Sequence, residues 1–256
     1  MHQILRSSLY GLLFLSLVAC TRSNAWQRNP VDDMIRDMAA EPTYSIILHD
    51  MDVQGNFVKS YQHKYRIVTQ GSDSIPQVTE TDWLEVPENF FNAHVDDMGM
   101  EIANKAEDGT VSKTASPAGF SNYVGNPEYG EWRTDSHGNS FWSFYGKYRL
   151  LSDIFYMSGR PIYRTGYYDY RDNYYGRRAY YGGTSSSGNP RYGTNSDHTR
   201  STRPNFFQRR ASKNGFTRST SRTQSSSTSS RSSRTSRSSS RYSGSSSRSR
   251  GGGFGK

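Results

Sequence analysis

The chain has 256 residues, a pI near 9.6 and a mean hydropathy of −0.87. So polar a composition excludes a polytopic membrane protein, and a single cysteine excludes a disulfide-stapled scaffold. The net charge of +9 conceals a split, because residues 184–256 carry 15 Lys and Arg against one acid, whereas residues 21–156 carry 11 against 20. The sequence therefore predicts an acidic folded body followed by a strongly basic tail.

The first 20 residues show the three regions of a secretory signal. A positively charged start is followed by a largely apolar run over residues 9–19, and the small residue Ala19 precedes Cys20. The run is too short to cross a bilayer, which takes about 20 apolar residues. We expect a signal peptide over residues 1–19, and a lipidated cysteine with its polar tether over residues 20–28.

Leu17, Val18, Ala19 and Cys20 resemble the lipobox of bacterial lipoproteins. In that class the signal is cut before the cysteine, which then carries a diacylglyceryl group and an amide-linked acyl chain such as palmitate. The resemblance implies a firm anchor at Cys20, because more than one chain is needed for stable membrane binding. It also implies the bacterial cell envelope, and Thr21 implies transfer to the outer membrane. The alternative is an ordinary signal with an incidental cysteine.

The first element predicted in the body is a helix over residues 30–40. Asn29 is a suitable N-cap and Pro30 suits the first helical position. Val31, Met34, Ile35 and Met38 recur at helical spacing and form one apolar stripe.

Antiparallel hairpins are predicted for most of the remaining body. Residues 44–69 read as two β-rich runs around turn residues 52–56, and further hairpins are expected within residues 100–115 and 131–145. Between the first two hairpins, a strand is expected to lead into a helix that begins at Pro87.

A closing helix is predicted from Gly146, because Tyr148, Leu151 and Ile154 fit helical spacing, and Gly159 is a plausible C-cap. The predicted fold class is therefore α+β, with one small domain of antiparallel hairpins and a helix near each end. That domain spans residues 29–158.

Composition changes after this domain. Residues 159–183 are rich in Tyr, Arg and Gly, and residues 184–256 are dominated by Ser, Arg and Gly with almost no aliphatic side chains. Such a segment buries too little apolar surface to offset the entropy of ordering. We expect residues 184–256 to form a long disordered tail.

Metal sites are weakly indicated. The run from Asp50 to Gly55 resembles the front of a calcium loop, but Tyr61 stands where a closing Glu is needed. His94, Asp96 and Asp97 put an imidazole beside two carboxylates, and with His49, Asp50 or His137 they form a candidate set for zinc or manganese. No spacing matches a zinc motif, so surface residues are the simpler interpretation. No cofactor is predicted apart from the lipid on Cys20.

Catalytic motifs are not found. The acids Glu85, Glu88, Asp96 and Asp97 offer carboxylate pairs for glycoside hydrolysis, which places an acid and a base about 5 to 9.5 Å apart. Any acidic domain contains such pairs, so we assign no catalytic residue. The aromatics near the third hairpin indicate a core more than a sugar platform; they are Trp132, Phe141, Trp142, Phe144, Tyr145 and Tyr148.

Spaced arginines make the tail a candidate site for polyanions, through counterion release. The candidate residues are Arg222, Arg231, Arg234, Arg237, Arg241, Arg248 and Arg250. Tyrosines within residues 167–181 are candidates for stacking. Outside a bacterial cytoplasm the available polyanions are lipopolysaccharide, anionic glycans and extracellular DNA. The alternative is a solvated spacer.

The combined expectation is an envelope-anchored lipoprotein with a non-enzymatic binding or structural role, attached to the membrane by its lipid and contacting anionic polymers through its tail. Two alternatives stay open. One is an envelope carbohydrate-directed hydrolase that uses the body carboxylates. The other is an adhesion component that self-assembles through the Tyr-rich region, in which case truncation near Gly159 leaves the body folded.

Overall fold

The computed structural model describes residues 29–55, 57–71, 75–155 and 161–212. All of these residues belong to one compact unit. The predicted signal peptide, the lipobox with Cys20 and the arginines from Arg222 to Arg250 lie outside the described residues. Within the part of the chain that is described, no helix has the length and apolarity needed to span a bilayer.

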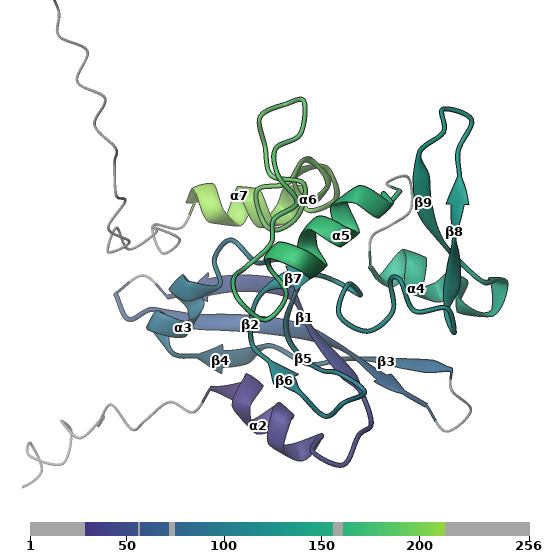
Figure 1. Cartoon of the computed structure of the whole chain (residues 1–256). Helices are drawn as coiled ribbons and strands as arrows, with labels where there is room; N and C mark the ends of the chain where they lie inside the picture. The colour runs from purple at the N-terminus through teal and green to yellow at the C-terminus, as the bar shows by residue number, and fades with distance from the viewer. Residues whose placement is uncertain (1–28, 56, 72–74, 156–160, 213–256) are drawn as a thin grey trace, which may run out of the picture. The chain divides into compact units, whose positions relative to one another are not determined.

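An antiparallel sheet of seven strands is the centre of the fold (Figure 1). The strands are β1 (Tyr44–Gln54), β2 (Ser60–Gln70), β3 (Pro76–Glu80), β4 (Leu84–Val86), β5 (Met100–Lys105), β6 (Val111–Ser112) and β7 (Ser116–Pro117). Their order is β3-β2-β1-β5-β6, with β4 also paired to β2 and β7 also paired to β5. The α+β fold class is confirmed.

The first two predicted hairpins are confirmed, with one correction. β1 pairs with β2, and β5 pairs with β6. Residues 52–54, predicted as turn, instead continue β1, and Val53 is buried in the core. A register shift between Leu48 and Asp50 places His49 at a bulge in the middle of β1. The bulge shifts the alternation of the strand, so that Ile46 and Leu48 before it and Met51 and Val53 after it lie in the same core.

Apolar residues cover both faces of the sheet. On one face Ile46 and Leu48 pack with Val31 of α2 (Pro30–Asp37) and Phe91 of α3 (Glu88–Ala93). The predicted start of α2 is confirmed, since the Asn29 side chain accepts a hydrogen bond from the Val31 N–H.

On the other face the neighbouring residue Ile47 packs with Tyr148 of the 3-10 helix η1 (Gly146–Tyr148) and with Leu151 of α4 (Arg149–Ile154). Alternate residues of β1 therefore serve two cores, as strand geometry requires. In Figure 1, α2 and α4 lie on opposite sides of the sheet. The predicted C-cap Gly159 lies outside the described residues.

The third predicted hairpin is also confirmed, as β8 (Gly130–Thr134) paired with β9 (Ser140–Phe144). It packs against α5 (Arg164–Asn173), which lies in the segment predicted to be separate from the body. Tyr163, Tyr167, Tyr170 and Tyr174 are spaced to share one helical face. Tyr167 and Tyr170 are buried in a third cluster with Phe120 and Trp142.

The predicted domain boundary after residue 158 is therefore wrong, as is the prediction of disorder from residue 184. Residues 184–212 include α6 (Asp197–Thr202) and α7 (Pro204–Ser212), and Phe206 of α7 is 1% exposed in the main core. The low content of aliphatic side chains predicted disorder, but a few buried aromatics and many hydrogen bonds hold this segment in place. The rest of the predicted tail, residues 213–256, lies outside the described residues.

Candidate ligand-binding cavity

A cavity of about 370 Å³ lies between the sheet and the segment that carries α6. Most of its apolar lining is buried and comes from four separate parts of the chain; it includes Met98, Ala118, Phe120, Phe155 and Ile162. Most of its polar lining is more exposed, including Ser185, Ser186, Arg191, Arg203 and His49, whereas Ser196 and Thr199 are buried. The cavity thus has an apolar interior and a polar, cationic mouth.

The turn before β5 holds the C-terminal wall of the cavity in place. Thr194 is fully buried; its hydroxyl donates to the Val95 carbonyl at 2.8 Å and accepts from the Met98 N–H at 3.0 Å. Its own N–H donates to the Asp96 carbonyl at 2.8 Å. These three bonds join residues nearly a hundred positions apart, so the cavity depends on this junction.

Close packing at the same junction demands glycine at position 193. Gly193 has φ +88°, and a Cβ there would lie 2.4 Å from the Asp96 carbonyl oxygen. Only glycine meets both requirements without strain.

The candidate metal ligands His94, Asp96 and Asp97 belong to this junction. The Asp97 carboxylate is buried, contacts the His94 Nδ1 at 2.8 Å and accepts from the Tyr181 hydroxyl at 2.6 Å. Asp96 accepts from the side chain of Asn195 at 3.1 Å. Across the described residues, no group of three or more His, Cys, Asp and Glu side chains is placed to hold a metal ion. These residues instead bond the C-terminal segment to the body.

The other candidate ligands are dispersed. His137 is exposed in the turn between β8 and β9, and His49 lies on the sheet at the cavity. Asp50 and Asp52 continue β1 and form ion pairs with Arg209 of α7, at 3.1 and 3.4 Å. Asp52, predicted within the turn over residues 52–56, thus lies in the strand, and the two acids hold a helix on the sheet.

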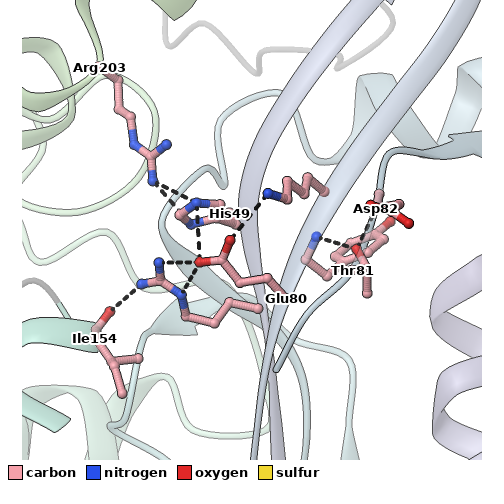
Figure 2. A network of polar contacts seen from close by, with 9 residues as sticks. His49, Glu80, Thr81, Asp82, Ile154 and Arg203 are labelled. Atoms are coloured by element: carbon pink, nitrogen blue, oxygen red, sulfur yellow. Dashed lines mark hydrogen bonds and ion pairs between the residues drawn. The ribbon is translucent and has the colours of Figure 1, made fainter. Parts of the chain in front are cut away.

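A chain of charged residues runs from the cavity across the sheet (Figure 2). The Arg203 Nη2 lies 3.0 Å from the His49 Nδ1 and donates to the imidazole. The same Nη2 lies 3.3 Å from the His49 Nε2, which in turn lies 3.7 Å from the Glu80 carboxylate.

Glu80 in turn accepts hydrogen bonds from two cationic side chains of β2. The Arg66 Nη2 lies 2.6 Å from one carboxylate oxygen, and the Lys64 Nζ lies 3.2 Å from the other. Three cations therefore surround His49 and Glu80, which supply one negative charge between them when the imidazole is neutral.

The charge state of His49 follows from these neighbours. Burial lowers the pKa of His49 to about 4, and the charges of Arg203 and Arg66 act in the same direction while Glu80 opposes them. Hydrogen bonding from Arg66 lowers the pKa of Glu80 to about 2. At pH 7 the imidazole is neutral, Glu80 is ionised, and the field at this end of the cavity is positive.

The candidate catalytic acids do not meet in the cavity. Glu85 of β4 accepts a hydrogen bond from the Ser60 hydroxyl, and Glu88 of α3 accepts one from the Tyr61 hydroxyl. Both donors belong to β2. Asp96 and Asp97 are engaged at the junction described above. Among the described residues that line the cavity there is no Asp or Glu.

Most of the predicted core aromatics are core residues, as expected. Trp142 and Tyr148 are buried, and Trp132 and Phe144 pack against the same clusters. Tyr145 is exposed. Trp142 packs on tyrosines from beyond residue 159, so a truncation near that point would remove part of this cluster.

One buried acid was not singled out from the sequence. Glu101 of β5 is fully buried beside the hydroxyls of Ser116 and Ser121, and the Ser116 hydroxyl donates to it at 3.4 Å. Burial raises the pKa of Glu101 to about 7, although hydrogen bonds from the nearby serines favour ionisation. Its position in a strand of otherwise buried residues was the available signal.

Comparison of the chain with protein-family models, with curated proteins and with solved structures finds no match.

Proposed function

We propose that the chain is an envelope-anchored lipoprotein with a non-enzymatic binding role, and that its folded part holds a small ligand in the cavity beside α6. The observation that carries the binding role is the division of the lining into a buried apolar interior and a polar mouth. Ligand sites combine these two features, and their volumes are about 300–1,000 Å³.

A binding role is favoured over the hydrolase alternative by the placement of the acids. A glycosidase needs two carboxyl groups facing the scissile bond. The described lining has none, and Glu85 and Glu88 bond to hydroxyls elsewhere. Self-assembly through the Tyr-rich region is likewise not favoured, because Tyr167, Tyr170 and Tyr180 are buried.

The anchor and the tail support the location and a second contact. Leu17 to Cys20 resemble a lipobox, which supports lipid attachment at the outer membrane. Residues 213–256 carry 10 Lys and Arg and no acid, which supports binding to lipopolysaccharide, anionic glycans or extracellular DNA. A domain tethered in this way samples ligands near the membrane surface.

The cavity is tested with Nile red, an uncharged apolar dye, and the chain lacking residues 1–19 with Cys20→Ser. We expect one saturable site per chain. Ser186→Trp, at the exposed mouth, and Ala118→Trp, in the interior, should each weaken binding at least tenfold. Ala40→Trp, exposed after α2, is the matched control and should bind as before. Saturable binding that both cavity variants retain would exclude this cavity as the site.

Circular dichroism separates loss of binding from loss of folding in these variants. Ala118 is buried, so its replacement can perturb the core, whereas Ser186 is exposed. If Ser186→Trp has the same melting temperature as the unmodified chain and still binds the dye with unchanged affinity, the cavity assignment fails, whatever Ala118→Trp does.

The anchor is tested by mass spectrometry of the mature amino terminus and by membrane fractionation. We expect a lipidated Cys20 in the membrane fraction, and release of the chain to the soluble fraction by Cys20→Ser. An unmodified Cys20 would contradict the lipoprotein proposal while leaving the cavity unaffected.

The tail is tested on heparin resin, with the chain ending at Ser212 as control. Retention of the full chain that falls with added salt, and is lost with the tail, is the expected result. Equal retention of the two chains would contradict the polyanion contact.

A further inference from the structure

The charges at the mouth of the cavity carry information about its ligand. Two arginines, Arg191 and Arg203, are among the described lining residues, and no Asp or Glu is. Arg191 is exposed and Arg203 is half-buried. Five apolar lining residues, by contrast, are at most 7% exposed; they are Met98, Ala118, Phe120, Phe155 and Ile162. The lining therefore combines more exposed cations with buried apolar surface.

The surroundings of the mouth reinforce its positive character. Behind Arg203, the ring of His49 is neutral at pH 7, and Glu80, which contacts that ring, is bound by both Arg66 and Lys64. The ion pairs therefore leave this chain of residues with a net positive charge. An anion placed at the mouth gains from that charge, because interactions in a partly buried site are screened less than in water.

The nearest acid along the C-terminal wall does not reverse this arrangement. Asp197 is not among the lining residues, and it accepts hydrogen bonds from Ser185, Ser187 and Asn189 at 2.5–2.9 Å. Those bonds fold the loop that carries Ser185 and Ser186 to the mouth. Asp197 thus fixes the loop at the mouth, and hydrogen-bond donors of that loop stabilise its negative charge.

We propose that the ligand is a small amphiphile with one apolar body and one anionic head group, a carboxylate or a phosphate. Its apolar part lies against Phe120, Phe155 and Ile162, and its head group meets Arg203 and Arg191. This inference rests on the proposed function of the cavity and adds the chemical class of the ligand. A guanidinium suits either head group, because its planar set of N–H donors matches carboxylate and phosphate oxygens.

The closing experiment compares ligands that differ only in the head group. Octyl phosphate, nonanoate and the uncharged octyl glucoside share an eight-carbon chain, and each is tested for displacement of Nile red from the chain with Cys20→Ser, below its micelle concentration. We expect the two anions to bind about tenfold to a hundredfold more tightly than octyl glucoside, as for a hydrogen bond to a charged group. Inorganic phosphate should bind more weakly than octyl phosphate, because it lacks the apolar part.

Substitutions locate the preference. Arg203→Gln should bring the anions close to the affinity of octyl glucoside and leave octyl glucoside unchanged, and Arg191→Gln should have the same effect to a smaller extent. Arg200→Gln is the matched control, since Arg200 is exposed on α6, stacks over the Phe207 ring and does not line the cavity. A melting curve verifies that each variant is folded.

The outcomes separate the two proposals. Equal affinity for octyl glucoside and the anions would overturn the anionic head group and leave the cavity as a binding site. Equal affinity for inorganic and octyl phosphate would overturn the apolar part. If the carboxylate and the phosphate bind with different affinities, the tighter one identifies the head group of the ligand as that of a fatty acid or of a lipid phosphate. Displacement that Ser186→Trp does not affect would place binding elsewhere and overturn both proposals.

Discussion

Replacement of Glu101 by Gln should change the pH dependence of stability. In the folded chain Glu101 is fully buried among Ser45, Ser116, Ser121 and Tyr170, and burial raises its pKa from 4.5 to about 7. The folded state therefore holds a proton that the unfolded state releases. Protonated Glu101 therefore contributes fully to the free energy of unfolding below pH 4.5, and this contribution is lost as the pH rises through 7.

The magnitude follows from the two pKa values. Each unit of pKa difference corresponds to about 1.4 kcal/mol, and between pH 5 and pH 8 most of the interval from 4.5 to 7 is crossed. The Gln side chain has a similar shape and does not titrate. Relative to the unmodified chain, Glu101→Gln should therefore gain about 2–3 kcal/mol in free energy of unfolding between pH 5 and pH 8.

The measurement is urea unfolding of both chains at several pH values, followed by circular dichroism. Only the difference between the chains is used, because burial also lowers the pKa of His63 and His49 and gives the opposite slope at acid pH. Those contributions are common to both chains and cancel. A difference that stays constant from pH 5 to pH 8 would show that Glu101 is ionised in the folded chain and would refute the reasoning.

Two further substitutions test the junction that holds the cavity wall. Thr194→Val keeps the shape of the side chain but leaves the Met98 N–H and the Val95 carbonyl unpaired, so urea unfolding should show a loss of about 2–4 kcal/mol. Gly193→Ala adds strain at φ +88° and a Cβ 2.4 Å from the Asp96 carbonyl oxygen, and should cost more than about 2 kcal/mol in the same assay.

Matched controls separate these effects from the chemistry of the substitutions. Thr165→Val is exposed on α5 and should change stability by less than about 0.5 kcal/mol. Gly138→Ala has φ +83° with open space around its Cβ, so it should lose only the strain of the backbone, about 1 kcal/mol. Thr194→Val or Gly193→Ala variants no less stable than their controls would contradict the proposed junction.

Local signals in the sequence predicted the early part of the fold. Asn29 and Pro30 marked the start of α2, and Pro87 marked the entry to α3, because capping depends on a few adjacent residues. Alternation within residues 57–69 predicted β2, whose Tyr61 and Tyr65 are buried. These features are properties of neighbouring residues, so the sequence alone contains them.

Local signals did not predict the C-terminal part of the fold, because its polar composition indicated disorder more strongly than the spacing of its tyrosines indicated a helix. Tyr163, Tyr167, Tyr170 and Tyr174 have helical spacing, but the Tyr, Arg and Gly content of residues 159–183 placed them outside the predicted domain. No local pattern shows that Phe206 fills the main core. Burial of a lone aromatic depends on the partners that the fold supplies, and those lie far away in the sequence.

The candidate site was beyond the reach of the sequence for the same reason. The predicted ligands His94 and Asp97 are neighbours in the structure, yet Tyr181, more than 80 positions away, engages Asp97 and gives it a structural role. The cavity likewise joins His49 of the first strand to Arg203 beyond α6.

The sequence by itself determined the helix starts, the hairpins and the separation of an acidic region from a basic one, because these follow from local propensity and charge. Only the tertiary structure decided where the folded part ends, which acids are structural and where a ligand has room. Those outcomes depend on contacts between distant segments, such as Thr194 with Met98, whose energies no local pattern contains.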